Sequence, residues 1–116
     1  MADDQGKLID IREREIKSFM ARRRPPEEIR DKLDLGYDFE NNVLEIYEIR
    51  PLWDGTGRKI RSQIAKTRYI KSRGVWKIYW RRASGKWELY QPCQEVQELS
   101  EFLRIVDEDE YACFWG

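Results

Sequence analysis

Basic and aromatic side chains alternate along a predicted hairpin near the middle of the sequence, and they are the residues best suited to binding chemistry. Alternate residues of a strand share one face of a sheet. With Ser84 and Gly85 at the turn, one face carries Trp76, Ile78, Trp80, Trp87 and Leu89, and the other carries Lys77, Tyr79, Arg81, Glu88 and Tyr90. Cations neutralise phosphates, and aromatic rings stack on bases. The second face is therefore predicted to bind single-stranded nucleic acid or another polyanion, while the first forms core.

Three basic residues, Arg58, Lys59 and Arg61, precede this hairpin and would extend the predicted binding surface. The same pattern has a purely structural interpretation, because cross-strand pairs such as Tyr79 with Tyr90 stabilise a hairpin by about 0.2–1 kcal/mol each. Both interpretations stay open at this point.

The preceding strand conflicts with this arrangement. In its simplest register Lys66 faces Trp80 and Arg68 faces Ile78, which puts two charges on the predicted core face. Three explanations are open: the two side chains reach the sheet edge, the tryptophan side is the wetter one, or the register is wrong by one residue, which inverts a strand.

The formal net charge of zero hides a strong separation of charge along the chain. Residues 50–90 hold 12 basic and 2 acidic residues, a local charge of +10, whereas residues 1–49 carry −4 and residues 91–116 carry −6. A basic centre between acidic ends indicates a chain that binds an anion, or its own ends, through its middle.

Catalytic chemistry finds little support in the sequence. The chain has no histidine, and two cysteines are too few for a zinc site, so we expect no metal and no cofactor. The spacing of Cys93 and Cys113 permits a disulfide, but the sequence has no export signal, so we expect free buried thiols. The most concrete enzyme hypothesis is a Mg²⁺-dependent nuclease site built from Asp38, Glu45, Glu48 and Lys66. In the segment 48–50, however, arginine stands where the restriction-nuclease pattern has lysine, and arginine cannot act as a base. We therefore expect no enzymatic activity.

Hydrophobic periodicity and turn residues predict an α+β fold in a single domain over residues 1–116. Helices are expected at 7–22, with Leu8, Ile9, Ile16, Phe19 and Met20 on one stripe, at 26–33, with Ile29 and Leu33 inward, and at 94–108. Strands are expected at 37–40, 43–50, 63–71, 75–82 and 86–91, as an antiparallel meander. The acidic run 108–110 is expected to meet a cationic partner, and the apolar tail 111–115 to pack onto the domain with the last helix on one face of the sheet.

The N-terminus lacks the apolar run of a signal peptide, and no stretch approaches the roughly 20 apolar residues of a membrane span. We expect a cytoplasmic protein that does not contact membrane.

Several strings resemble one known family in order and over nearly the whole chain: Arg23–Pro26, Leu33–Gly36, Glu48–Pro51 followed by Trp53, Gly74–Trp80 and Glu108–Gly116. They are similar to a short bacterial family known as domain of unknown function 3024. The resemblance implies a small, stand-alone bacterial protein. It implies no activity, cofactor or site residue.

Two hypotheses of function follow. The first is a non-enzymatic binding module that contacts nucleic acid or another polyanion through Lys77, Tyr79, Arg81, Tyr90, Arg58, Lys59 and Arg61. The second is a protein–protein module or homodimer, in which the acidic C-terminal helix of one copy docks on the basic sheet of another.

Overall fold

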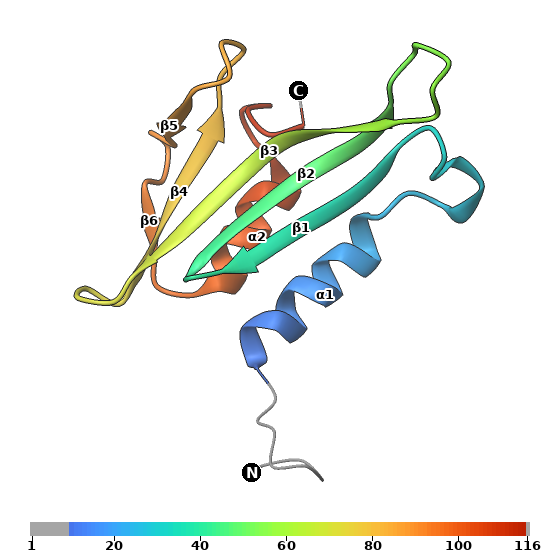
Figure 1. Ribbon diagram of the computed structural model, residues 1–116. Coiled ribbons are helices and arrows are strands. Elements are labelled where there is room, and N and C mark those ends of the chain that lie inside the picture. The colour runs from blue at the N-terminus through green and yellow to red at the C-terminus, as the bar shows by residue number, and fades with distance from the viewer. Residues whose placement is uncertain (1–9, 116) are drawn as a thin grey trace, which may run out of the picture.

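Two helices cover one face of an antiparallel sheet (Figure 1). The computed structural model describes residues 10–115. The helices are α1 (Ile11–Arg23), the 3₁₀ turn η1 (Glu27–Ile29) and α2 (Leu99–Glu108). The strands are β1 (Asp34–Glu40), β2 (Val43–Pro51), β3 (Lys59–Ile70), β4 (Val75–Arg81), β5 (Trp87–Leu89) and β6 (Glu95–Val96). The strand order β1-β2-β3-β4-β5, with β6 also on β4, confirms the α+β meander.

The first helix begins where the sequence supplies a capping carboxylate. Asp10 accepts a hydrogen bond from the backbone N–H of Arg12 at 2.9 Å, which satisfies one of the unpaired donors of the first turn. Burial of Ile16, Phe19 and Met20 confirms the predicted apolar stripe, while residues 7–9, with Leu8 and Ile9, lie outside the described residues. Within residues 10–115 no helix combines the length and the apolarity needed to cross a bilayer.

The predicted helix at 26–33 is wrong, because only the single turn η1 forms there. Ile29 is 44% exposed rather than inward. The chain extends into β1 at Asp34, three residues before the predicted strand, and this carboxylate accepts two hydrogen bonds of 2.8 Å from Arg24 at the end of α1. The guanidinium of Arg24 lowers the pKa of Asp34 to about 2. The ion pair thus joins the end of α1 to the start of β1.

Two short strands share the outer edge of β4. β5 pairs with residues 79–81, and β6 pairs with Trp76 and Lys77. Because residues 95–96 are extended, α2 begins at Leu99 rather than at the predicted residue 94. The chain therefore reaches α2 from the sheet edge and crosses back over the helix-covered face.

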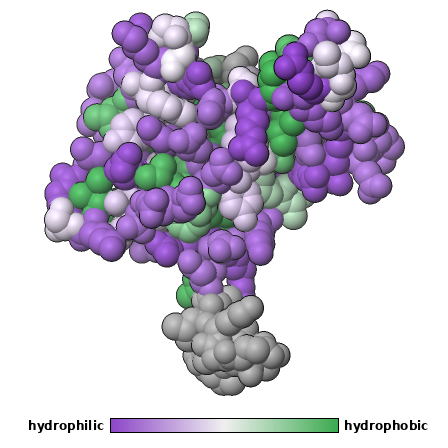
Figure 2. Space-filling view, in the orientation of Figure 1, coloured by the Kyte–Doolittle hydropathy of each residue, from purple (hydrophilic) through white to green (hydrophobic). Residues whose placement is uncertain are grey.

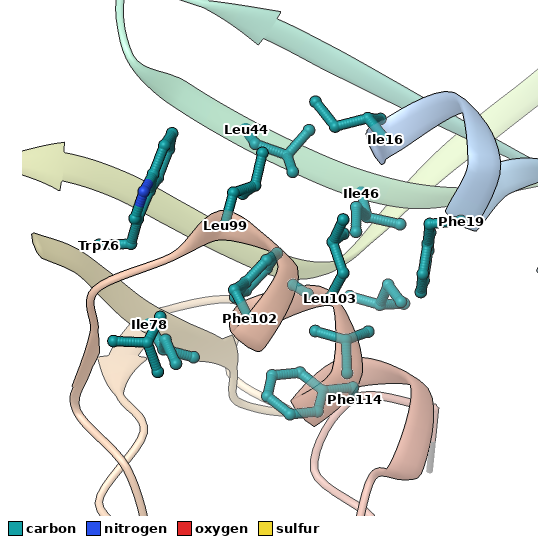
Figure 3. Packing of buried hydrophobic residues seen from close by; sticks show 14 of the residues in the cluster. Ile16, Phe19, Leu44, Ile46, Trp76, Ile78, Leu99, Phe102, Leu103 and Phe114 are labelled. Atoms are coloured by element: carbon teal, nitrogen blue, oxygen red, sulfur yellow. The ribbon is translucent and has the colours of Figure 1, made fainter. Parts of the chain in front are cut away.

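The core lies between the two helices and the sheet (Figure 3). α2 contributes Leu99, Phe102, Leu103 and Val106, α1 contributes Ile16, Phe19 and Met20, and the sheet contributes, among others, Leu44, Ile46, Trp76 and Ile78. One polar side chain, Thr67, is fully buried among them. Its hydroxyl donates to the carbonyl oxygen of Lys77 at 2.7 Å, so its burial leaves no unpaired donor.

The C-terminal tail packs onto the domain, as predicted, and it does so through Asp109. This residue adopts φ 41° at the end of α2, and its carboxylate accepts the backbone N–H groups of Phe114 at 3.1 Å and Trp115 at 2.9 Å. The indole N–H of Trp115 donates to the carbonyl oxygen of Val106 at 2.8 Å. Phe114 is consequently only 4% exposed. The acid expected to meet a cation instead meets backbone amides.

Candidate functional site

The register of the last hairpin differs by one residue from the prediction. Tyr79 pairs with Leu89, Trp80 with Glu88 and Arg81 with Trp87. The turn holds three residues rather than two: Gly85 has φ 88°, and its N–H donates to the carbonyl oxygen of Arg82 at 2.8 Å. This one-residue difference inverts β5, because successive side chains point to opposite faces.

Tyr90 is the predicted site residue that this inversion removes. It is 3% exposed on the helix-covered face, in ring contact with Phe114 at a centroid distance of 5.0 Å. Burial, together with nearby Cys113 and Asp109, raises the pKa of Tyr90 to about 12. The prediction that Tyr90 lies on the binding face is wrong, and Trp87 and Leu89 take its place there.

A second correction applies between β3 and β4. Lys66 pairs with Tyr79 and Arg68 with Lys77, because the connecting loop holds four residues, 71–74, closed by hydrogen bonds to the carbonyl oxygen of Ile70. Of the three explanations for charges on the core face, the one-residue register error is the right one. Both cations lie on the face opposite the helices.

The corrected registers bring Lys66, Tyr79 and Trp87 together on the open face, which is the face of the sheet without helices. The ammonium of Lys66 lies 4.9 Å from the ring centroid of Tyr79 and 4.8 Å from that of Trp87. All three side chains are half-buried. Burial lowers the pKa of Lys66, and the facing carboxylate of Glu45 opposes that shift. Two aromatic rings and a cation therefore share one solvent-accessible cluster.

Two further cations lie beside this cluster as a like-charged pair. Arg68 and Lys77 are direct cross-strand partners, an arrangement that destabilises a sheet by electrostatic repulsion. Within residues 10–115 neither forms an ion pair. An anion bound between them would relieve the repulsion.

Arg61 lies farther along the same face, where its side chain stacks on Tyr47, which in turn lies over Gly36. Its guanidinium is 4.4 Å from the ring centroid of Tyr47, and it donates to Asp38 at 3.3 Å. Tyr47 in turn covers its strand partner Gly36 and is only 6% exposed. Because Gly36 has no side chain, the ring of Tyr47 can lie against the backbone there and support Arg61.

Replacing Gly36 with alanine is expected to lower the free energy of unfolding by about 1–3 kcal/mol, the usual cost of overpacking. An added Cβ would lie 2.7 Å from Cε1 of Tyr47. The sign is informative, since an alanine normally stabilises a strand relative to glycine. Urea unfolding measures the change, with Tyr47→Ala as a second background. If Gly36→Ala costs as much there as in the wild type, the ring is not the cause.

The remaining predicted site residues are scattered. Arg58 lies in the β2–β3 loop and is bound to Asp54 at 2.8 Å, and Lys59 is exposed at the start of β3. Arg81 lies on the open face and donates to the side-chain oxygen of Gln63. The structure thus unites Lys77, Tyr79 and Arg81 with each other, but separates them from Arg58.

The acidic residues of the nuclease hypothesis do not form one site. Asp38, Glu45 and Lys66 are successive cross-strand partners on the open face. Glu48 lies on the other side of the sheet, because it is three residues from Glu45 and successive side chains of β2 point to opposite faces. It pairs there with Arg50 at 3.2 Å. Within residues 10–115 no group of three potential metal ligands is close enough to hold an ion.

The charges of the strands divide between the two halves of the sheet. β1 and β2 carry five acidic residues and one basic residue, whereas β3, β4 and β5 carry six basic residues and one acidic residue. In Figure 1, α2 lies behind the sheet, on the face opposite the open face. The acidic C-terminal helix therefore does not cover the basic side chains of the open face. Figure 2 shows hydrophilic residues over most of the surface in this view.

Comparison with known proteins assigns a family but no activity. Residues 5–116 match the family described as Domain of unknown function (DUF3024). The chain belongs to the DUF3024 family. No curated protein and no solved structure matches the chain significantly. The function of this DUF3024 protein therefore has to be inferred from the open face itself.

Proposed function

We propose that the DUF3024 protein binds single-stranded nucleic acid on the open face of β3, β4 and β5. The observation that carries this proposal is the solvent-accessible cluster of Lys66, Tyr79 and Trp87. Aromatic rings on a sheet face stack on unpaired bases at about 1–3 kcal/mol per base, whatever the base. Neighbouring cations contact the phosphates between those bases.

The like-charged pair supports the same ligand. Arg68 and Lys77 repel each other in the unbound protein. A phosphate placed between them gains two charge-assisted contacts and removes that repulsion. Arg81, one pair farther along β4 from Tyr79, continues the row of cations past the rings. Phosphate contacts and stacking surfaces therefore alternate along the face.

A single strand fits this surface better than a duplex does. Reading a duplex requires a helix or ribbon that enters a groove, and both helices of the described chain pack against the opposite face of the sheet. Unpaired bases can lie flat on exposed rings, as single-stranded RNA does on the four-stranded sheets of RNA-recognition modules. A bacterial origin and a cytoplasmic location stay predictions.

The test is binding of fluorescent oligothymidylate and oligouridylate across a salt series. Three or four phosphate contacts predict a slope of log K against log salt of about −2 to −3 for single strands. Trp87→Ala should weaken binding about tenfold through lost stacking, and Arg68→Gln with Lys77→Gln should flatten the slope by about 1. The matched control is Lys17→Gln, which removes an exposed cation from α1.

Two results would overturn the proposal. One is an absence of binding at the lowest salt concentration. The other is an equal loss of affinity per removed charge in Lys17→Gln and in the Arg68 and Lys77 variant, because net charge alone would then explain the interaction. Far-ultraviolet circular dichroism of each variant establishes that the fold is retained.

A further inference from the structure

The strand β3 has a neighbour on each side over only half of its length. β2 pairs with it from Lys59 to Arg68, but β4 pairs only with residues 65–70. Beyond residue 65, β4 continues with β5 as a separate hairpin. Figure 1 shows the β2–β3 arm and the β4–β5 hairpin diverging, with the C-terminal segment between them. Residues 59–64 therefore form an open sheet edge.

The backbone groups that face this edge follow from the hydrogen-bond alternation of an antiparallel ladder. The N–H of Leu52 donates to the carbonyl oxygen of Arg58 at 2.7 Å, so residues 58, 60 and 62 face β2. Lys59, Arg61 and Gln63 then turn their N–H and C=O groups outward. The partner of Lys59 is Pro51, which has no N–H to donate to the ladder. This agrees with a position at which the backbone groups of Lys59 do not face β2.

A pocket of about 460 Å³ lies along this edge. On the open-face side it is lined by Arg61, Gln63 and Arg81, and on the helix side by Ile64, Phe114 and Trp115 together with the polar residues Glu48 and Ser62. The cation of Arg81 has only the neutral amide of Gln63 as its hydrogen-bond partner among the described residues. The two walls thus differ: one is basic, and the other combines apolar side chains with Ser62 and with Glu48, whose charge is paired with Arg50.

We propose that this edge binds an extended peptide with alternating acidic and apolar residues, which adds to the sheet as a strand beside residues 59–63. Backbone hydrogen bonds would supply affinity, and the alternate side chains would supply specificity. Acidic side chains of the peptide would face Arg61 and Arg81, and its apolar side chains would face Phe114 and Trp115. The site does not depend on nucleic-acid binding.

A peptide suits this edge better than a second copy of the chain. Pairing of two β3 edges would bring Lys59 and Arg61 near the same cations of the partner, which is a known protection of edge strands against self-association. If a different edge of a second copy paired with β3, the rest of that copy's sheet would collide with the β4–β5 hairpin and Trp115, which form the walls of the pocket. A single extended segment carries no such bulk.

The test uses a fluorescent peptide of alternating glutamate and valine, acetylated and amidated, with a lysine–valine peptide as control. In a series of variants of the glutamate–valine peptide, one backbone nitrogen at a time is methylated. Methylation should weaken binding about tenfold at alternate residues, whose N–H groups face β3, and should be tolerated at the others. Arg61→Glu should abolish binding, whereas Lys17→Glu, a matched reversal on α1, and Trp87→Ala on the open face should leave it unchanged.

Three results would overturn the peptide site: no binding of the glutamate–valine peptide, an equal affinity for the lysine–valine peptide, or an N-methyl scan without alternation, which would indicate attraction by charge alone. Sedimentation of the wild-type chain alone completes the test. Self-association that Arg61→Glu abolishes would assign the edge to a second copy instead. Because Trp87→Ala should reduce only nucleic-acid binding, failure of one site is distinguishable from failure of the other.

Discussion

Replacing Asp109 with alanine is expected to lower the free energy of unfolding by about 2–4 kcal/mol, because hydrogen bonds to a charged group contribute about 1.5–3 kcal/mol each. The carboxylate accepts two backbone N–H groups of the tail, from Phe114 and Trp115. Position 109 also has φ 41°, a conformation that aspartate adopts more readily than alanine. The loss is measured by urea unfolding and would be a large fraction of the stability of a small domain.

Two variants separate the hydrogen bonds from the charge. Asp109→Asn keeps one acceptor oxygen and tolerance of positive φ, so it should lose less than the alanine variant. Glu110→Ala removes a neighbouring exposed acid and should change stability by less than about 0.5 kcal/mol. Equal losses in Asp109→Ala and Glu110→Ala would contradict a specific tail clamp. Exposure of Phe114 in the alanine variant should also increase binding of an apolar dye.

Replacing Phe102 with alanine is expected to lower the free energy of unfolding by about 3–5 kcal/mol, through lost burial and the cavity left behind. Phe102 is fully buried and projects from α2 into the core beside Leu103 (Figure 3). Thermal and urea unfolding, with the slope of the urea curve checked for two-state behaviour, measure the change.

The matched control for Phe102 is Arg104→Ala on the exposed side of the same helix. Alanine is the best helix former, so this variant should be within about 0.5 kcal/mol of the wild type. A loss of less than about 1 kcal/mol in Phe102→Ala would contradict the packing of α2 against the sheet. Phe102→Leu, which retains most of the volume, should lie between the two.

The elements of the fold could be predicted because local signals agreed with the tertiary structure. Pro25 and Pro26 follow α1, which ends within one residue of the predicted residue 22, and Asn41 and Asn42, both with positive φ, form the turn between the predicted strands 37–40 and 43–50. The errors occur where a short segment has no periodicity of its own. η1 is one turn long, and β6 is two residues long, so neither leaves a repeating pattern.

The candidate site could be predicted only in part, because its composition depends on loop lengths. Reading Ser84 and Gly85 as a two-residue turn placed Tyr90 on the open face, whereas the three-residue turn places Trp87 there. The glycine at position 85, with its positive φ, was the available signal for the longer turn. The same kind of error hid Lys66, the cation that joins the two rings.

The bulge in β3 had no signal in the sequence. It inserts Ile64 between Gln63 and Ala65, which pair with the successive residues Tyr47 and Ile46 of β2. Its effect is to bury both Ile64 and Ala65. Irregularities of this kind arise from the packing of a whole sheet rather than from a local preference. The nuclease hypothesis fails for a simpler reason, because alternation along β2 places Glu45 and Glu48 on opposite faces.

The uneven charge of the sheet limits how much of a nucleic acid this protein can hold. Because β1 and β2 repel phosphates while β3, β4 and β5 attract them, a bound strand is confined to a band three strands wide, or roughly 10 Å between the outer strand axes. A band of this width accommodates only two or three stacked bases. The protein should therefore have a short footprint and coat a long strand as closely spaced, individually weak units.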